Sequence, residues 1–369
     1  MSTFPMTLRL ITMMILSISL TNTAYAQTNG DKTMISPDAW LYPLNEISQV
    51  ACHNCFEHRF TTAKGSFSTV LNDIKTLEID FWDQKTLFLG GQPKAWYVRH
   101  DANFLGFFNS GNDNSCSGDG NGTNDLRACL KDVKRWSDDH SDHFPIIIML
   151  DKKQSWSHVQ GSDRKPANLD DLVRDAFKEA LFAPKDLFAF AEPEKPLDKD
   201  GDTLQARVKV KGWPRPSDLK GRILVVLNGS DVLNVGLSVA SQILNILVKT
   251  SFKVDDCVMN QYLDEQGLNA AMFVAPNLST EAEVNGKSGC ISAKNAKFVV
   301  MNNMDASHKH LSGKAYNEKH LTRVWGNDHE AFSAQVASKT GLATYDRYLA
   351  QKKASYRIVH IPPETPVSE

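Results

Sequence analysis

The stretch PIIIMLD, residues 145–151, decides the fold of this chain. Its apolar residues follow one another without a break and end in a carboxylate, Asp151. A continuous apolar run of this length suits a strand that is buried on both faces, as in a parallel sheet. Runs of the same character recur at 48–54, 76–83, 96–101, 222–228, 270–277, 297–303 and 356–362. The sequence therefore predicts eight such strands, most of which end in a polar or charged residue.

Helix-like segments lie between the predicted strands. In residues 123–140, apolar positions recur at helical spacing after Thr123, a candidate N-cap. Similar segments occupy 68–75, 168–182, 231–252 and 328–341, the last of which closes on a glycine. Eight strands alternating with helices predict an α/β fold of the (β/α)8 TIM-barrel class.

The chain is longer than the roughly 250 residues typical of such a barrel. We therefore expect insertions, and the Gly/Asn/Ser-rich loop 109–123 and the connector 152–221 are the clearest candidates. The sequence shows no internal repeat and no second domain. Residues 27–369 are expected to form a single domain.

The first residues resemble an export signal. A weakly basic start at Arg9 precedes an apolar run over 10–20, and Ala24-Tyr25-Ala26 is a small-x-small cleavage site. The apolar run is shorter than the roughly 20 residues that cross a bilayer. We expect a signal peptide over 1–26 that is removed, which leaves no integral membrane segment and a secreted or periplasmic protein. An uncleaved anchor is the alternative.

The overall charge limits the partners that the protein can have. The formal net charge is −2, and hydrophobic residues make up 41% of the chain. A near-neutral protein without a basic stripe gives no reason to expect nucleic acid or electrostatic binding to anionic lipid. We expect a monomer.

The chain has six cysteines, and an even number in an exported protein favours disulfides. Pairing of nearest neighbours joins Cys116 to Cys129 and Cys257 to Cys290. Cys52 and Cys55 form the remaining candidate pair, which encloses His53 and Asn54. Two other readings of this motif are weaker. A redox-active dithiol needs a cysteine at a helix N-terminus, and a zinc site needs a second pair of ligands.

Four of the predicted strands carry polar side chains where they end, and TIM-barrel enzymes place their catalytic groups there. The residues are His53 and Asn54, Glu78 and Asp80, His100, and Asp151 with Lys153 just beyond it. The i, i+2 spacing of Glu78 and Asp80 puts both carboxylates on one face of their strand. Carboxylate and amide oxygens are ligands that Ca²⁺ prefers, and imidazoles move protons near neutral pH. The pattern predicts a calcium site beside two catalytic histidines.

In this order, the residues resemble the catalytic barrel of phosphatidylinositol-specific phospholipases C. CSGDGNGTNDLRACLKDVKRWSDDHSDHFPIIIMLDKK (116–153) is similar to a segment of the calcium-dependent, single-barrel, secreted branch of that superfamily. GWPRPSDLKGRILVVLN (212–228) is similar to the lead into its fifth strand. The resemblance covers about 46–230 and is poor afterwards.

The resemblance implies a Ca²⁺-dependent phosphodiesterase that acts on a phospholipid at a membrane surface. It further implies that the Ca²⁺ ligands are Asn54, Glu78, Asp80 and Asp151. His53 and His100 would be the catalytic pair, and Lys153 would contact phosphate. In the family reaction, the inositol 2-hydroxyl attacks the neighbouring phosphate and diacylglycerol departs.

The sequence departs from the family pattern in two places. Cys55 stands where a Ser or Thr usually follows His-Asn. The stretch FVAPNLSTE (273–281) has no arginine where one is expected to hold the headgroup.

Three other functions stay open from the sequence. A glycerophosphodiester phosphodiesterase would fit YVRHD (97–101), but its His-Arg-Gly motif is absent near residue 53. A catalytically inactive barrel that binds lipid headgroups is a second alternative. A periplasmic thiol oxidoreductase that uses Cys52 and Cys55 is a third.

Overall fold

The structure is a computed structural model. It describes residues 34–57, 67–83, 96–100, 114–117, 125–154, 156, 164–194, 197, 201–229, 257–284, 291–346, 348 and 356–363. Three predicted features therefore lie wholly or mostly outside the described residues: the signal peptide over 1–26, the loop 109–123 and the helix over 231–252.

Within the described residues, eight parallel strands form a barrel. They are β1 (Ile47–Cys52), β2 (Thr76–Trp82), β4 (Ile146–Lys152), β5 (Ile223–Gly229), β6 (Phe273–Val274), β7 (Met301–Asp305), β8 (Leu321–Trp325) and β9 (Leu342–Tyr345). Each pairs with the next in this order except β6, and β9 pairs with β1. Between β6 and β7 there is an isolated parallel bridge from Asn277 to Asn303. The step from β6 to β7 is closed by the N–H of Leu278, which donates to the carbonyl of Asn303 at 2.8 Å. The predicted TIM-barrel class is confirmed.

Two of the predicted barrel strands lie outside the barrel. The run 96–101 holds β3 (Tyr97–Val98), which pairs antiparallel with β2. The run 356–362 holds β10 (Ile358–His360), which pairs antiparallel with β1. The barrel takes β8 and β9 instead, which the sequence reading missed because polar residues interrupt their short apolar runs.

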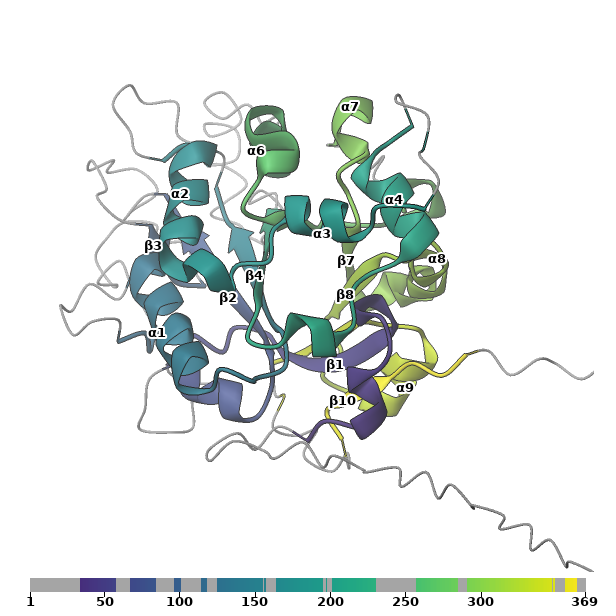
Figure 1. Ribbon diagram of the computed structural model, residues 1–369. Coiled ribbons are helices and arrows are strands. Elements are labelled where there is room, and N and C mark those ends of the chain that lie inside the picture. The colour runs from purple at the N-terminus through teal and green to yellow at the C-terminus, as the bar shows by residue number, and fades with distance from the viewer. Residues whose placement is uncertain are drawn as a thin grey trace, which may run out of the picture.

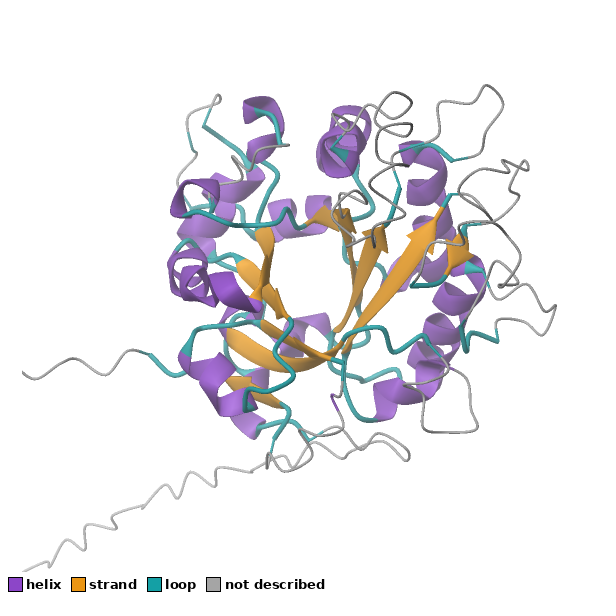
Figure 2. Cartoon of the chain, turned by 180° about the vertical axis from the view of Figure 1, so that it is seen from behind, coloured by secondary structure: helices purple, strands orange, loops and turns teal. Residues whose placement is uncertain are grey.

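The helices lie outside the ring of strands, as Figure 2 shows. They are α1 (Leu126–Asp139), α2 (Pro166–Phe177), α3 (Pro184–Phe190), α4 (Leu204–Lys211), α6 (Val258–Gln266), α7 (Ala293–Ala296), α8 (Ser312–Asn317) and α9 (Phe332–Ala337). The long connector between β4 and β5 contains α2, α3 and α4. α1 and α2 lie side by side (Figure 1). Among the described residues, no helix is long and apolar enough to cross a membrane.

Short 3-10 turns complete the connections. They are Pro37–Trp40, Leu44–Glu46, Phe67–Asn72, Lys178–Ala180, Pro216–Leu219, Gly267–Asn269, Glu281–Glu283 and Ala306–Leu311. The segment 68–75, predicted as a helix, thus forms one of these turns.

The N-terminus of α1 shows why the chain turns into a helix there. The carboxylate of Asp125 accepts a hydrogen bond from the N–H of Ala128 at 3.1 Å and so caps the first turn. The predicted cap, Thr123, lies outside the described residues. The buried face of α1 includes Leu126, Leu130 and Val133, whose spacing matches the helical repeat.

The strands separate two apolar layers. Alternate residues such as Ile147, Met149 and Val226 fill the barrel interior, and their neighbours Ile146 and Ile148 pack outward against the helices. Burial on both faces is what the uninterrupted apolar run at 145–151 predicts. The apolar filling of the interior gives way to polar side chains at the carboxyl ends of the strands, where Asp151 follows Met149 on the same face.

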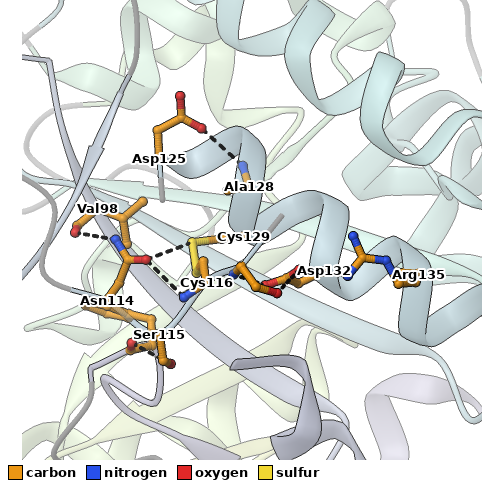
Figure 3. The surroundings of a disulfide bond; sticks show 11 residues. Val98, Asn114, Ser115, Cys116, Asp125, Ala128, Cys129, Asp132 and Arg135 are labelled. Carbon is orange, nitrogen blue, oxygen red and sulfur yellow. Dashed lines mark hydrogen bonds and ion pairs between the residues drawn. A yellow bond between two sulfur atoms is a disulfide. The ribbon is translucent and has the colours of Figure 1, made fainter. Parts of the chain in front are cut away.

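The predicted cysteine pairs are present as far as the described residues extend. Disulfides join Cys52 to Cys55 and Cys116 to Cys129. Figure 3 shows the second pair between Asn114 and the buried face of α1. Cys257 is also in a disulfide, and its predicted partner, Cys290, lies outside the described residues.

Candidate active site

Three buried carboxylates meet where β2 and β4 end. Glu78 and Asp80 lie on the same face of β2, and Asp80 is directly opposite Asp151 in the β2–β4 register. One oxygen from each of the three lies within 4.8 Å of the others. In the described part of the chain, this is the only group of three or more His, Cys, Asp or Glu side chains placed to hold a metal ion.

The charge on Asp80 is unfavourable because three carboxylates are buried together. Lys153 places its Nζ 2.6 Å from Oδ2 of Asp151 and 3.2 Å from Oδ2 of Asp80. Burial raises the pKa of Asp80 well above its usual range. Lys153 opposes that increase in pKa, and Glu78 and Asp151 add to it. The site is therefore electrostatically suited to take up a further cation.

The oxygen atoms of this cluster fit a hard metal ion. Oδ1 of Asp80 and Oδ1 of Asn54 are buried and have no hydrogen-bond partner. The other two oxygens that face the cluster, Oδ2 of Asp80 and Oε2 of Glu78, are each 3.2 Å from a cationic group, Lys153 and His53 respectively. Buried oxygens without donors cost free energy unless something else satisfies them. Three carboxylates and one amide oxygen form the type of ligand set that Ca²⁺ takes.

His53 lies beside this cluster with both ring nitrogens engaged. Its Nδ1 is 2.5 Å from Oδ1 of Asp346, and its Nε2 is 3.2 Å from Oε2 of Glu78. Burial by itself would lower the pKa of His53, but Glu78 and Asp346 outweigh it and the pKa is raised. The imidazole is thus favoured in its protonated form, ready to donate a proton or a hydrogen bond.

Asp346 is a site residue that the sequence reading missed. It directly follows β9, and its own N–H donates to Oδ1 of Asp328 at 2.8 Å. Because the reading did not recognise β9 as a barrel strand, it could not place Asp346 at the same rim as His53. The polar end of LATYD (342–346) was the available signal.

Arg323 is a second residue that the sequence did not predict at the site, and it pairs with one of the carboxylates, Glu78. Its Nη2 is 2.7 Å from Oε1 of Glu78, and its side chain is only 3% exposed. The other guanidinium nitrogens donate to Oδ1 of Asn303 at 3.1 Å and to Oγ1 of Thr344 at 3.2 Å. Whereas the family pattern led us to expect an arginine near the sixth strand, this one comes from β8 and fixes one oxygen of Glu78.

The structure brings most of the predicted site residues together. His53 pairs with Glu78, Lys153 pairs with Asp80 and Asp151, and the three carboxylates lie together. Asn54 follows His53 at the end of β1, and its Nδ2 is 3.3 Å from Nδ1 of that histidine.

His100 has a different place in the fold from the one predicted. It does not end a parallel barrel strand but follows β3, the antiparallel partner of β2. The N–H of the preceding residue, Arg99, donates to the carbonyl of Asp80 at 3.3 Å. His100 is half-buried and directly follows this residue, next to the backbone of Asp80.

One family of known proteins matches part of this chain. A family model described as phosphoinositide phospholipase C, Ca²⁺-dependent, matches residues 120–253. Comparison with curated proteins gave no significant match.

Solved structures resemble nearly the whole chain. One is the calcium-dependent phosphoinositol-specific phospholipase C from the Gram-negative bacterium Pseudomonas sp, in its apo form, myoinositol complex. It is 39% identical, covers 89% of this chain and 99% of its own, and superposes with a TM-score of 0.75. A second crystal form of that apo enzyme is 38% identical with the same coverage and a TM-score of 0.74. A Ca²⁺-dependent phosphatidylinositol-specific phospholipase C from Streptomyces antibioticus shares the fold, at 20% identity, with coverage of 86% and 98% and a TM-score of 0.62.

Proposed function

Since the chain belongs to the calcium-dependent phosphoinositide-specific phospholipase C family, we propose that it cleaves phosphatidylinositol-type lipids to diacylglycerol and a cyclic inositol phosphate. The observation that carries this proposal is the buried set of Glu78, Asp80 and Asp151 next to His53. The family is Ca²⁺-dependent and catalyses phosphodiester cleavage.

Asn54, Glu78, Asp80 and Asp151 are the residues that would hold Ca²⁺. The bound ion would lower the pKa of the attacking hydroxyl and neutralise charge on the phosphoryl group. Arg323 holds Glu78 from below through Oε1 and leaves Oε2 of that carboxylate facing His53. Lys153 is close enough to the cluster to place its ammonium group on a phosphate oxygen.

In the reaction we propose, the inositol 2-hydroxyl oxygen bonds to phosphorus and its proton passes to a carboxylate of the cluster. His53 donates a hydrogen bond from Nε2 to the crowded phosphorane, and Asp346 keeps the proton on its Nδ1. The bond from phosphorus to the diacylglycerol oxygen then breaks. His100 is assigned the general-acid role and protonates that oxygen.

We also propose that the protein is exported and that residues 1–26 are removed on the way. The small-x-small sequence at Ala24-Tyr25-Ala26 and the disulfides support this, since disulfides persist in oxidising compartments. Mass spectrometry of the protein recovered from its native host tests it. We expect a mature N-terminus at Gln27, and a protein that retains residues 1–26 in the cytoplasm would exclude export.

The activity is tested with purified protein and phosphatidylinositol vesicles, in Ca²⁺ or in EDTA, with the water-soluble products followed by ³¹P NMR. We expect a cyclic inositol phosphate that forms only with Ca²⁺ and is lost on His53→Ala. Turnover of glycerophosphodiesters without turnover of phosphatidylinositol would favour the glycerophosphodiester phosphodiesterase. Absence of turnover on every phosphodiester would favour the inactive, headgroup-binding barrel.

A further inference from the structure

The Cys52–Cys55 disulfide encloses two residues of the candidate site, His53 and Asn54. Cys52 is the last residue of β1, and both cysteines are buried, at 1% and 0% exposure. The loop that the disulfide closes is therefore attached to the end of a central barrel strand. Whatever conformation this loop adopts sets the direction in which His53 and Asn54 leave the barrel.

Asn54 leaves the strand in an uncommon backbone conformation. Its φ is +57°, in the left-handed region that L-residues rarely occupy, although Asn tolerates it better than most. The other non-glycine residues with positive φ in the described part of the chain are Lys178, Lys319 and Lys339, none of which belongs to the site. Such a conformation persists at a functional site only when its surroundings enforce it.

Backbone hydrogen bonds fix this loop, but the side-chain oxygen of Asn54 has no hydrogen-bond donor. The N–H of His53 donates to the carbonyl of Tyr345 at 3.0 Å, and the N–H of Glu57 donates to the carbonyl of Asn54 at 3.0 Å. In contrast, the side-chain Oδ1 of Asn54 is buried and accepts no hydrogen bond. Oδ1 of Asn54 is therefore an oxygen of the type that binds Ca²⁺, and no group of the protein donates a hydrogen bond to it.

We propose that the Cys52–Cys55 disulfide is a positioning element of the metal site, which holds Asn54 in its left-handed conformation and so sets the affinity for Ca²⁺. The inference rests on the proposed role of Asn54 as a ligand. Without the covalent link, the loop is free to relax to ordinary negative φ values, which would turn the amide oxygen away from the carboxylates. Groups that orient metal ligands typically change metal affinity by about 10–100-fold.

The second disulfide offers a matched control. Cys116 and Cys129 are also buried. Ser115, next to Cys116, donates two hydrogen bonds to the carbonyl of Phe56, just outside the Cys52–Cys55 loop, at 2.8 and 3.0 Å. The Cys116–Cys129 link spans a sequence separation of 13 and the Cys52–Cys55 link spans 3, so the former constrains the unfolded chain more. It encloses no residue of the candidate site.

The experiment compares Cys52→Ala/Cys55→Ala with Cys116→Ala/Cys129→Ala. Ca²⁺ affinity is measured by isothermal titration calorimetry and stability by thermal unfolding in EDTA. We expect the first variant to bind Ca²⁺ at least about 10-fold more weakly, while the second binds within about 2-fold of wild type yet loses more in melting temperature. A Cys52→Ala/Cys55→Ala protein with wild-type Ca²⁺ affinity would overturn the proposal.

A third variant tests the role of the disulfide separately from the proposed role of Asn54 as a Ca²⁺ ligand. Asn54→Ala removes the ligand and keeps the disulfide. If Asn54→Ala weakens Ca²⁺ binding and the Cys52→Ala/Cys55→Ala protein does not, Asn54 is a ligand that needs no covalent brace. If Asn54→Ala binds Ca²⁺ as wild type does, the ligand assignment itself is wrong.

A measurement on the wild-type protein keeps the inference testable should a variant fail to fold. The protein is equilibrated in dithiothreitol buffers with and without Ca²⁺, and each disulfide is scored by differential alkylation and mass spectrometry. Each reduction gives two thiols while the dithiol becomes a cyclic disulfide. Because coupling is reciprocal, saturating Ca²⁺ should shift the Cys52–Cys55 equilibrium toward the disulfide by about 10-fold or more and leave Cys116–Cys129 unchanged. Equal midpoints with and without Ca²⁺ would contradict the coupling.

Discussion

At the scale of single residues, the protonation of His53 depends on two carboxylates that contact its two ring nitrogens. Asp346 contacts Nδ1 and Glu78 contacts Nε2, and both raise the pKa of the imidazole against the effect of burial. Arg323 opposes this increase in pKa from the far side of Glu78. The proton on His53 is thus set by groups from β2, β8 and the end of β9.

Replacement of Asp346 tests this arrangement. In Asp346→Asn, the orienting negative charge is lost, and we expect kcat to fall by about 10²-fold with little change in KM. Because Asp346 raises the pKa of His53, the limb of the pH profile that reports deprotonation of His53 should move to lower pH. The exposed Asp139→Asn serves as control, and an unchanged pH profile in Asp346→Asn would refute the assignment.

Arg323 is expected to matter for stability as much as for the site. Arg323→Met leaves the buried carboxylate of Glu78 without its cation, and loss of one partner of a buried pair costs about 3–5 kcal/mol. Urea unfolding in EDTA measures the free energy of unfolding. Lys294→Met, which breaks an exposed pair with Asp264 at 3.4 Å, should change it by less than about 1 kcal/mol. A similar loss of unfolding free energy in the two variants would show that the buried Arg323–Glu78 pair contributes no more than an exposed pair.

At the scale of elements, β7 and β8 are joined by a buried polar pair. His320, just before β8, places its Nδ1 2.7 Å from Nδ2 of Asn302 on β7. Burial lowers the pKa of His320 to about 4. The charge of Glu318 opposes this decrease in pKa, and that of Lys209 adds to it. The histidine is thus neutral in the folded protein across most of the acidic range.

This pair predicts a pH dependence of stability. The ordinary pKa of histidine is about 6.5, so between about pH 6.5 and about pH 4 the unfolded chain binds more protons than the folded one. The free energy of unfolding therefore falls as the pH is lowered through this window, by up to about 3 kcal/mol. Urea unfolding at several pH values should show a flatter slope in His320→Gln. The exposed His310→Gln should keep the wild-type slope, and equal slopes in all three proteins would exclude His320 as the cause.

At the scale of the whole molecule, the barrel carries a concentration of buried negative charge that Ca²⁺ would neutralise. Ligand that binds only the folded state stabilises it, by about 2.7 kcal/mol at a free concentration 100 times the Kd. We therefore expect Ca²⁺ to raise the melting temperature of the wild-type protein relative to EDTA.

Asp80 should couple metal binding to stability. Its pKa is raised by burial first and then by the neighbouring Glu78 and Asp151, against the effect of Lys153. Asp80→Asn removes this buried charge, so we expect a melting temperature in EDTA that is higher by a few degrees, roughly 2–4 °C. The same variant should gain little from Ca²⁺. Differential scanning calorimetry checks both effects, and an Asp80→Asn protein that Ca²⁺ stabilises as much as wild type would contradict the metal assignment.

The sequence by itself determined the fold class and pointed to most of the residues that the structure groups at the candidate site. Long apolar runs such as 145–151 report burial on both faces locally, and i, i+2 pairs such as Glu78 and Asp80 share a face whatever lies elsewhere. The resemblance to a calcium-dependent phospholipase C rested on these same strand ends, and the solved structures agree with it.

Only the tertiary structure decided which strands close the barrel and what surrounds the predicted residues. Pairing depends on contacts between distant segments, so β3 and β10 could not be told from β8 and β9 by their composition. His53 and Asp346 are 293 residues apart, and no local pattern links them. Arg323 appeared in the sequence as an interruption of a strand. It became the partner of Glu78 because closure of the barrel buried both charges together.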